Sequence, residues 1–178
     1  NPFELKTGLE RYAYNPAKAN QLLDEAGYKT GADGIRRDPQ GNKLHFVIST
    51  TTSSVRAREF PVIQAYWKEI GVETEFKPMA SNKFFGDILP KGEFDLGMAS
   101  TSDDPGQPVA YSRWHSSQIP TAENGYVGTN RMHFSNAALD KALEGTVSTV
   151  DVNKRKAAFY DAQRIINQQV PWILLTWE

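Results

Sequence analysis

The chain has 178 residues, of which 39% are apolar and 23% are charged, and its formal net charge is −1. This balance is typical of a globular domain with a core, and it gives no electrostatic reason to expect binding to nucleic acid or to a lipid surface. There are no cysteines, which excludes disulfides and cysteine-based zinc sites, and no apolar run is long enough to span a membrane. Because the chain opens at Asn1 without an initiator methionine or a signal-like segment, we expect it to be an excised piece of a longer protein.

The first predicted element is a helix over residues 15–28. Asn15 can cap this helix, Pro16 suits the first helical position, and Gly27 can end it. The segment 31–43 that follows contains three glycines and a proline, which predicts turns around a tight hairpin.

A strand, a helix and a second strand are predicted next. Residues 43–51 are apolar and β-branched, and residues 72–78 alternate between apolar or β-branched and charged side chains, so both favour strands. Residues 54–71 have helical spacing, and Pro61 predicts a bend there or a helix that begins near it. The inward face of this helix is predicted to carry Val55, Val62, Ala65, Tyr66 and Ile70.

The second half of the chain contains a long irregular segment. A short helix over 82–92 leads into a strand over 94–99, and the sequence then shows no regular pattern until about Ser135. Loops of this length inside a compact domain are usually functional.

Two further helices and a last strand complete the predicted elements. One helix is capped by Asn136 and ended by Gly145, and the other is capped by Asp151 and broken by Pro171. The alternation of helices and strands predicts a three-layer α/β domain with a mostly parallel mixed sheet. The predicted sheet contains residues 44–50, 72–77, 94–99 and 172–176, with Trp172, Ile173, Leu174 and Leu175 forming a buried strand.

Several segments, taken in order, resemble the bacterial extracellular solute-binding proteins of family 5, the oligopeptide- and dipeptide-binding receptors of ABC importers. They are NPAKANQLLDEAGY, ADGIRRDPQGNKL, KEIGVETEFKP, GEFDLGMAS, SNAALDKALE and KRKAAFYDAQRIINQQVPWILL. The resemblance implies a periplasmic-binding-protein-like type II fold. It also implies that residues 1–178 form most of the second, C-terminal lobe of a two-lobed protein, without the first lobe and the hinge crossings.

The resemblance implies a binding function without bond chemistry. The expected ligand is a small solute held between the two lobes, a peptide by the resemblance, with a sugar or another polar solute as alternatives. The expected partners are the missing first lobe and the membrane subunits of an ABC importer, with no nucleic acid and no cofactor. The expected location is the periplasm or cell surface, with the full-length protein anchored to the membrane as a lipoprotein.

The segment FDLGMASTSDDPGQP, residues 94–108, carries the candidate ligand site. In open α/β sheets, ligands lie beyond the carboxyl ends of the strands, and here the strand runs into small hydroxyl residues and two acids. These residues are Ser100, Thr101, Ser102, Asp103 and Asp104. The resemblance implies an acid that pairs with a peptide's amino group, and Asp104 falls closest to its place. Many relatives have an aromatic residue before this acid, whereas this chain has Ser-Thr-Ser, which leaves sugars and other polar solutes open. A second interpretation is that the two acids only form a turn before Pro105.

Aromatic and basic residues of the irregular segment are further candidates. Tyr111, Trp114 and Tyr126 either pack beneath the loop or line the cleft and stack on a ligand, and Trp114 is the preferred candidate. Arg113 and Arg131 either meet a ligand carboxylate or are solvated or paired with local acids.

The remaining polar candidates favour structural roles. His45, His115 and His133 are the only histidines, and they lack metal-ligand spacing, so no metal site is predicted. Asp140 matches a recurrent aspartate of the family, and we interpret it as bonding a nearby loop or backbone group.

Two other classes of function remain as alternatives. One is a hydrolase-type domain that uses Asp103 or Asp104, although the chain has no GxSxG, Walker, HExxH or GxGxxG motif and no cysteine nucleophile. The other is a protein-interaction domain without a small ligand.

Overall fold

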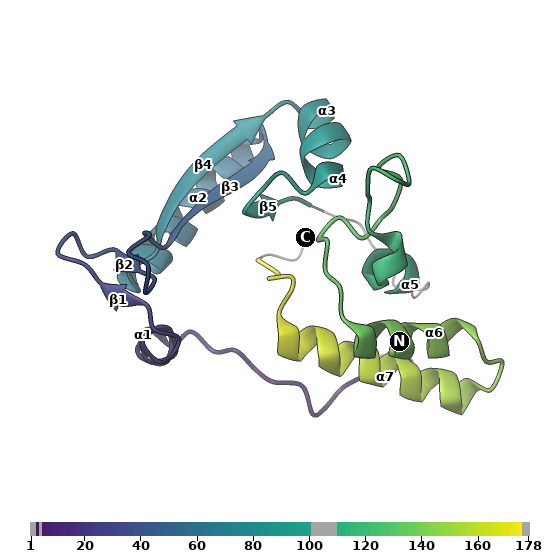
Figure 1. Ribbon diagram of the computed structural model, residues 1–178. Helices are drawn as coiled ribbons and strands as arrows, with labels where there is room; N and C mark the ends of the chain where they lie inside the picture. The colour runs from purple at the N-terminus through teal and green to yellow at the C-terminus, as the bar shows by residue number, and fades with distance from the viewer. Residues whose placement is uncertain (1–2, 4, 101–109, 176–178) are drawn as a thin grey trace. The chain divides into compact units, whose positions relative to one another are not determined.

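The computed structural model describes Phe3, residues 5–100 and residues 110–175, which form two compact units (Figure 1). Unit 1 consists of Asn1–Arg11, Leu89–Gly92 and Thr101–Glu178, and unit 2 of Tyr12–Ile88 and Glu93–Ser100. Among the described residues, no helix combines the length and the apolar character that crossing a membrane requires.

Unit 2 is built around a parallel sheet with the strand order β4-β3-β5, whose strands lie side by side in Figure 1. The strands are β3 (His45–Thr51), β4 (Glu73–Met79) and β5 (Leu96–Met98). Both neighbours pair with β3 in parallel, so that Ile48 lies between Phe76 and Leu96. Three of the four predicted sheet segments are therefore confirmed, and all three strands end at the same edge of the sheet.

Helix α2 (Ser54–Glu69) follows β3 and packs on the sheet. Its Phe60 stacks on Phe76 of β4 with 4.7 Å between ring centroids, and Ile63 packs in the same core cluster. The helix runs through Pro61 instead of beginning there, because the residues on both sides of the proline are held in this cluster. The predicted inward face was wrong, since the packed residues are Phe60, Ile63 and Trp67, whereas Val55 is 40%, Val62 52% and Tyr66 52% exposed.

Helix α1 (Pro16–Glu25) and a small hairpin precede the sheet. The Asn15 side chain accepts a hydrogen bond from the Lys18 N–H at 2.9 Å, which confirms the predicted cap. Gly27 follows the helix with a φ of +90°, a left-handed conformation that glycine adopts without strain. Strands β1 (Lys29–Thr30) and β2 (Arg36–Arg37) then pair antiparallel, which confirms the predicted hairpin.

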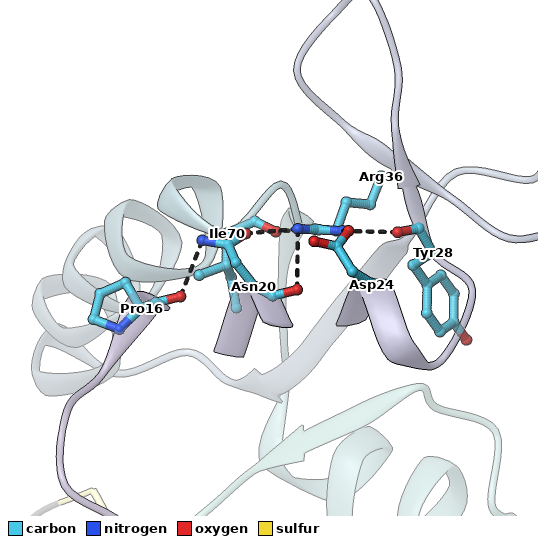
Figure 2. A network of polar contacts seen from close by, with 6 residues as sticks. All are labelled: Pro16, Asn20, Asp24, Tyr28, Arg36 and Ile70. Atoms are coloured by element: carbon cyan, nitrogen blue, oxygen red, sulfur yellow. Dashed lines mark hydrogen bonds and ion pairs between the residues drawn. The ribbon is translucent and has the colours of Figure 1, made fainter. Parts of the chain in front are cut away.

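A buried arginine joins these elements (Figure 2). Arg36 is only 3% exposed, and its guanidinium donates five hydrogen bonds. Three donations go to α1, at 2.7 Å to the Asn20 side chain, 3.4 Å to the Asn20 carbonyl and 2.7 Å to the Asp24 carboxylate. Others reach the Tyr28 carbonyl at 2.7 Å and the Ile70 carbonyl, just after α2, at 2.9 Å. One side chain thus fixes α1, the hairpin and the end of α2 to each other.

The predicted helix over 82–92 is confirmed as a run of short helical segments. These are α3 (Ser81–Lys83), the π-helical turn η1 (Phe84–Ile88) and α4 (Leu89–Lys91). Phe84 is fully buried and Ile88 nearly so, and both belong to unit 2, whereas α4 belongs to unit 1.

Unit 1 contains α5 (Ala110–Trp114), the 3₁₀ turn η2 (Ser116–Gln118), and the helices α6 (Ala137–Val147) and α7 (Val152–Gln169), which lie side by side. Asn136 and Asp151 cap α6 and α7 as predicted. Gly145 does not end α6, which continues to Val147. A Cβ at Gly145 would lie 3.0 Å from the Ala158 Cβ, so this glycine permits α6 to approach α7 closely.

The strand predicted over 172–176 is not formed in its described part, so this part of the sheet prediction was wrong. Residues 170–175 have no regular structure, and Ile173 is 59%, Leu174 65% and Leu175 49% exposed. A strand needs hydrogen bonds from a neighbouring strand, and none of the strands in the described residues pairs with this segment. Trp172 instead packs on Trp114, with 5.8 Å between ring centroids.

Candidate functional site

The candidate site of unit 2 is the carboxyl edge of the parallel sheet. The end of β3 is polar and buried, with Thr50 fully buried and Thr51 6% exposed. The Thr50 hydroxyl donates to the Met98 carbonyl at 2.6 Å, and the Thr52 N–H donates to the Met79 carbonyl at 2.9 Å. These bonds fix the ends of all three strands, so the residues that leave the sheet here start from defined positions.

Arg56, in the first turn of α2, lies over this edge. Its guanidinium donates to the Thr51 hydroxyl at 3.2 Å and to the Ser100 hydroxyl at 2.8 Å. It thereby ties the end of β3 to the residue from which the chain leaves β5. Within the part of the chain that the structure describes, no carboxylate forms an ion pair with Arg56. Arginine is suited to bind a carboxylate by donating two parallel hydrogen bonds, so this guanidinium can bind an anionic group.

Sequence reasoning missed Arg56, although the sequence held a signal for it. Arg56 comes five residues after Thr51 and two after the first residue of α2. In a strand-to-helix connection of this kind, the first helical turn lies at the carboxyl edge of the sheet.

We expect Arg56→Gln to destabilise unit 2 by about 1–2 kcal/mol, because two hydrogen bonds between strand ends are lost and each contributes about 0.5–1.5 kcal/mol. The measurement is urea unfolding of the chain. Arg58→Gln is the matched control, since Arg58 is exposed on the same helix, and it should change stability by less than about 0.5 kcal/mol. Equal effects of the two variants would show that Arg56 does not link the strands.

The structure describes only part of the predicted ligand segment. Ser100 lies at the carboxyl edge, in contact with Arg56. Thr101, Ser102, Asp103 and Asp104 lie outside the described residues.

The three candidate aromatics all belong to unit 1 and differ in burial. Trp114 is 8% exposed and packs with Leu139, Leu143 and Ala162 in the core of that unit. Tyr111 is half-buried and stacks on His115, with 4.4 Å between ring centroids. Tyr126 is 41% exposed, which makes it the most accessible of the three.

Tyr126 sits in a tightly braced loop. The Asn124 side chain accepts the N–H groups of Thr121 at 2.9 Å and Val127 at 3.1 Å, and it donates to the Ile119 carbonyl at 2.9 Å. Tyr126 itself has a φ of +59°, a conformation that is strained for a tyrosine. These bonds therefore hold the loop backbone at Tyr126, whose ring is exposed.

The other polar candidates have structural contacts in unit 1. The Arg113 guanidinium lies 5.6 Å from the centroid of the Trp172 ring. His115 Nδ1 accepts the Ser117 N–H at 3.1 Å, and His133 Nε2 donates to the Leu89 carbonyl at 2.9 Å. Arg131 is half-buried. Among residues 3, 5–100 and 110–175, no three or more His, Cys, Asp or Glu side chains are placed to hold a metal ion.

Asp140 on α6 fixes the turn after α5. Its carboxylate accepts the Ser116 N–H at 2.8 Å and also the Ser116 hydroxyl. The predicted structural role, bonding a nearby loop, is confirmed.

Comparison with known proteins identifies relatives of this fold. Residues 2–122 match the family described as bacterial extracellular solute-binding proteins, family 5 Middle. The oligopeptide-binding protein AppA of Bacillus subtilis is 30% identical over 172 residues, covering 94% of this chain and 30% of that protein. Heme-binding protein A of Haemophilus influenzae is 28% identical over 170 residues, covering 93% of this chain and 28% of that protein.

Solved structures give the same result. AppA in complex with a nonapeptide superposes with a TM-score of 0.83 at 28% identity, covering 95% of this chain and 33% of that one. NikZ from Campylobacter jejuni in complex with Ni(L-His) gives a TM-score of 0.79 at 25% identity, covering 94% and 33%. The chain therefore has the α/β fold of a type II periplasmic binding protein and spans about a third of the length of these proteins.

Proposed function

The chain belongs to the bacterial extracellular solute-binding proteins of family 5, and from this premise we propose that it forms most of the second lobe of a receptor that delivers peptides to an ABC importer. Residues 1–178 would then be one lobe, with the first lobe and the hinge elsewhere in the full-length protein. The relatives are receptors for solutes, so the proposed function is binding without catalysis.

The polar carboxyl edge of the sheet is the single observation that carries this proposal. Arg56, Thr51 and Ser100 form a connected group there, and Arg56 has no carboxylate partner in the described part of the chain. A peptide has a terminal carboxylate that Arg56 can bind and an amino group that Asp104 can bind. AppA has been solved with a nonapeptide, which supports a peptide for this chain as well. A sugar or another polar solute would use the same hydroxyls without the ion pairs.

The proposed ligand contacts are the segment Ser100–Asp104 and at least one of Tyr111, Trp114 and Tyr126. The small hydroxyl residues that follow β5 in the sequence would offer hydroxyl and backbone groups to a ligand. Because Arg56 binds Ser100, it acts as a positioning residue for the start of this segment. The exposed ring of Tyr126 offers a surface on which a ligand can stack.

The mechanism is a shift between open and closed forms. A ligand that contacts both lobes binds the closed form more tightly and raises its population, and the closed form docks on the membrane subunits of the importer. The full-length protein would act in the periplasm or at the cell surface, held to the membrane by a lipid anchor.

The test is peptide binding by the full-length protein. We expect native mass spectrometry to show a one-to-one complex with members of a pool of synthetic peptides of mixed sequence and length. The isolated chain should bind the same pool only feebly, because half a cleft leaves most of the ligand in water. Absence of any peptide complex of the full-length protein, with complexes formed by an oligosaccharide pool, would replace peptide by sugar as the ligand.

Replacing Asp104 by Asn in the full-length protein should weaken peptide binding about tenfold to a hundredfold with the fold intact, because a charge-assisted hydrogen bond to the peptide amine contributes about 1.5–3 kcal/mol. Calorimetry measures the affinity. Asp161→Asn, which removes an exposed acid paired with Arg164, is the matched control and should leave affinity unchanged. Unchanged affinity of the Asp104 variant together with a lower melting temperature would show that this residue only forms a turn.

A further inference from the structure

The connection between α6 and α7 exposes three valines. Val147 ends α6 and is 66% exposed, Val150 is 98% exposed, and Val152 begins α7 and is 59% exposed. We call residues 147–156 the α6–α7 tip. Single exposed apolar residues are ordinary on protein surfaces, but here three fall within six residues of one connection.

Three consecutive basic residues follow the valines. They are Lys154, Arg155 and Lys156, in the first turns of α7. Cations near a helix N-terminus are unfavourable, because that end of the helix carries partial positive charge. No acid occupies the first turn of α7, so the only local compensation there comes from the capping residue Asp151. The sequence therefore concentrates positive charge where it opposes helix stability.

None of these three cations is neutralised by a carboxylate in the described part of the chain. The Arg155 guanidinium lies 5.1 Å from the centroid of the Phe3 ring, and the Lys156 ammonium lies 5.5 Å from that of Tyr160. Lys154 is exposed. Ring contacts leave the charge of a cation in place, but Arg155 and Lys156 are half-buried and Arg155 Nε is buried without a hydrogen-bond partner, so Lys154 is the most accessible of the three.

Acidic groups near the tip are few. Asp151 is the only acid among residues 147–156, and its carboxylate accepts the N–H groups of Asn153 at 2.9 Å and Lys154 at 3.0 Å. The carboxylate of Glu144, one turn before the tip, lies 3.7 Å from His115 Nε2. The tip is therefore net positive, although the chain as a whole has a net charge of −1.

We propose that the α6–α7 tip docks on the anionic headgroups of a phospholipid membrane. The valines enter the headgroup region, Lys154 pairs with lipid phosphates, and Arg155 and Lys156 add positive charge at the same end of the helix. Apolar residues beside basic ones are the combination that binds peripheral segments to anionic membranes. The nearly neutral net charge of the whole chain does not exclude this site, because acids elsewhere in the chain balance the local basic cluster. A receptor outside the cytosol that serves a membrane importer would be held near the bilayer by this contact.

The test uses the full-length protein, expressed in the cytosol so that no lipid is attached, and co-sedimentation with vesicles. The vesicles contain phosphatidylcholine alone or phosphatidylcholine with an equal amount of phosphatidylglycerol. We expect binding only to the anionic vesicles and a decrease at high salt. Lys154→Gln with Lys156→Gln should weaken the partitioning by about tenfold to thirtyfold, since each basic residue near the surface contributes about fivefold. Val147→Ser with Val150→Ser should weaken it while leaving the charge unchanged.

The matched control is Lys18→Gln with Lys29→Gln, which removes the same charge from exposed positions of unit 2. Equal loss in the control and tip variants would show that net charge, and not the tip, governs binding. Absence of binding to anionic vesicles would overturn the proposal. It would also be overturned by binding that appears only when the vesicles contain the importer's membrane subunits, which would assign the tip to a protein partner. Peptide binding is not needed for any of these outcomes.

Discussion

Replacing Arg36 by Met should destabilise unit 2 by about 3–5 kcal/mol, because Arg36 is buried and several of its acceptors lose their donor, although its ion-pair partner Asp24 is 55% exposed. The methionine fills much of the space but leaves the carbonyls of Tyr28 and Ile70 and the side chain of Asn20 without their donor. Buried polar groups without a partner each cost about 1–3 kcal/mol, so the loss exceeds that of a single hydrogen bond. Urea unfolding of the chain, followed by fluorescence and circular dichroism, gives the change in unfolding free energy.

Arg37→Met is the control for this variant. Arg37 is the next residue along β2 and forms an ion pair with Asp33, but its side chain is 31% exposed. Exposed ion pairs contribute about 0–1 kcal/mol, so the control should remain close to the wild type. A loss below about 1 kcal/mol for Arg36→Met would contradict the role of Arg36 as the joint between α1, the hairpin and the end of α2.

The pH dependence of stability provides a second measurement on the same network. The hydrogen bond from Arg36, aided by the attraction between the charges, lowers the pKa of Asp24 below its usual value. A lowered pKa in the folded state means that the stabilisation is complete above the ordinary pKa of an aspartate, about 4, and is lost as the pH falls through the lowered value. The Arg36→Met variant should lack this part of the acid-induced loss of stability.

The sequence predicted the elements whose signals are local. Helix caps are such signals, and Asn15, Asn136 and Asp151 each bond the backbone as expected. The strands β3, β4 and β5 were also predicted, because their residue types and the alternation of their side chains can be read directly from the sequence. Gly145 shows the limit of local signals, since its role is to admit the side chain of Ala158 from another helix.

Elements that depend on distant partners were predicted less well. The apolar run at 172–175 has the composition of a buried strand, but composition does not supply a neighbouring strand, and its side chains are exposed. The inward face of α2 was misassigned because apolar or aromatic side chains lie on both faces, with Val62 and Tyr66 on one and Phe60 and Ile63 on the other. Only the register of Phe60 on Phe76 selects between these faces.

The sequence directed the search for a ligand site to the carboxyl edge of the sheet, and ligand binding there stays a prediction. The rule that ligands lie beyond the carboxyl ends of strands led to Ser100 and the residues after it. Arg56 was missed because an arginine on a helix has no spacing motif, and its contact with Ser100 spans 44 positions of the sequence. Ligand contacts by Asp103 and Asp104 stay a prediction, since these residues lie outside the described part of the chain.

Replacing Gly128 by Ala should disrupt the loop over residues 115–134 and cost about 3 kcal/mol or more. A Cβ at this position would lie 2.3 Å from the Gln118 carbonyl oxygen, 3.0 Å from its carbon and 3.1 Å from the Pro120 nitrogen. All three are backbone atoms, so no side-chain rotation can relieve the clash. The Gln118 carbonyl also accepts the N–H of the buried Asn130 at 3.0 Å, and Asn130 in turn bonds the Trp114 and Phe134 carbonyls. The added methyl group therefore displaces the Gln118 carbonyl and weakens the hydrogen bonds that hold the whole loop. The expected cost is at or above the usual range for overpacking.

Hydrogen exchange read by mass spectrometry separates this local effect from global unfolding. In Gly128→Ala, amides of residues 115–134 should lose protection while those of β3 and β4 in unit 2 keep theirs. Gly86→Ala is the matched control, because a Cβ at Gly86 would meet no atom within 4 Å and alanine is the better helix former by about 1 kcal/mol. That variant should be neutral or slightly stabilising. If the two alanine variants give the same exchange pattern, the close approach of Gly128 to Gln118 does not hold the loop that presents Tyr126.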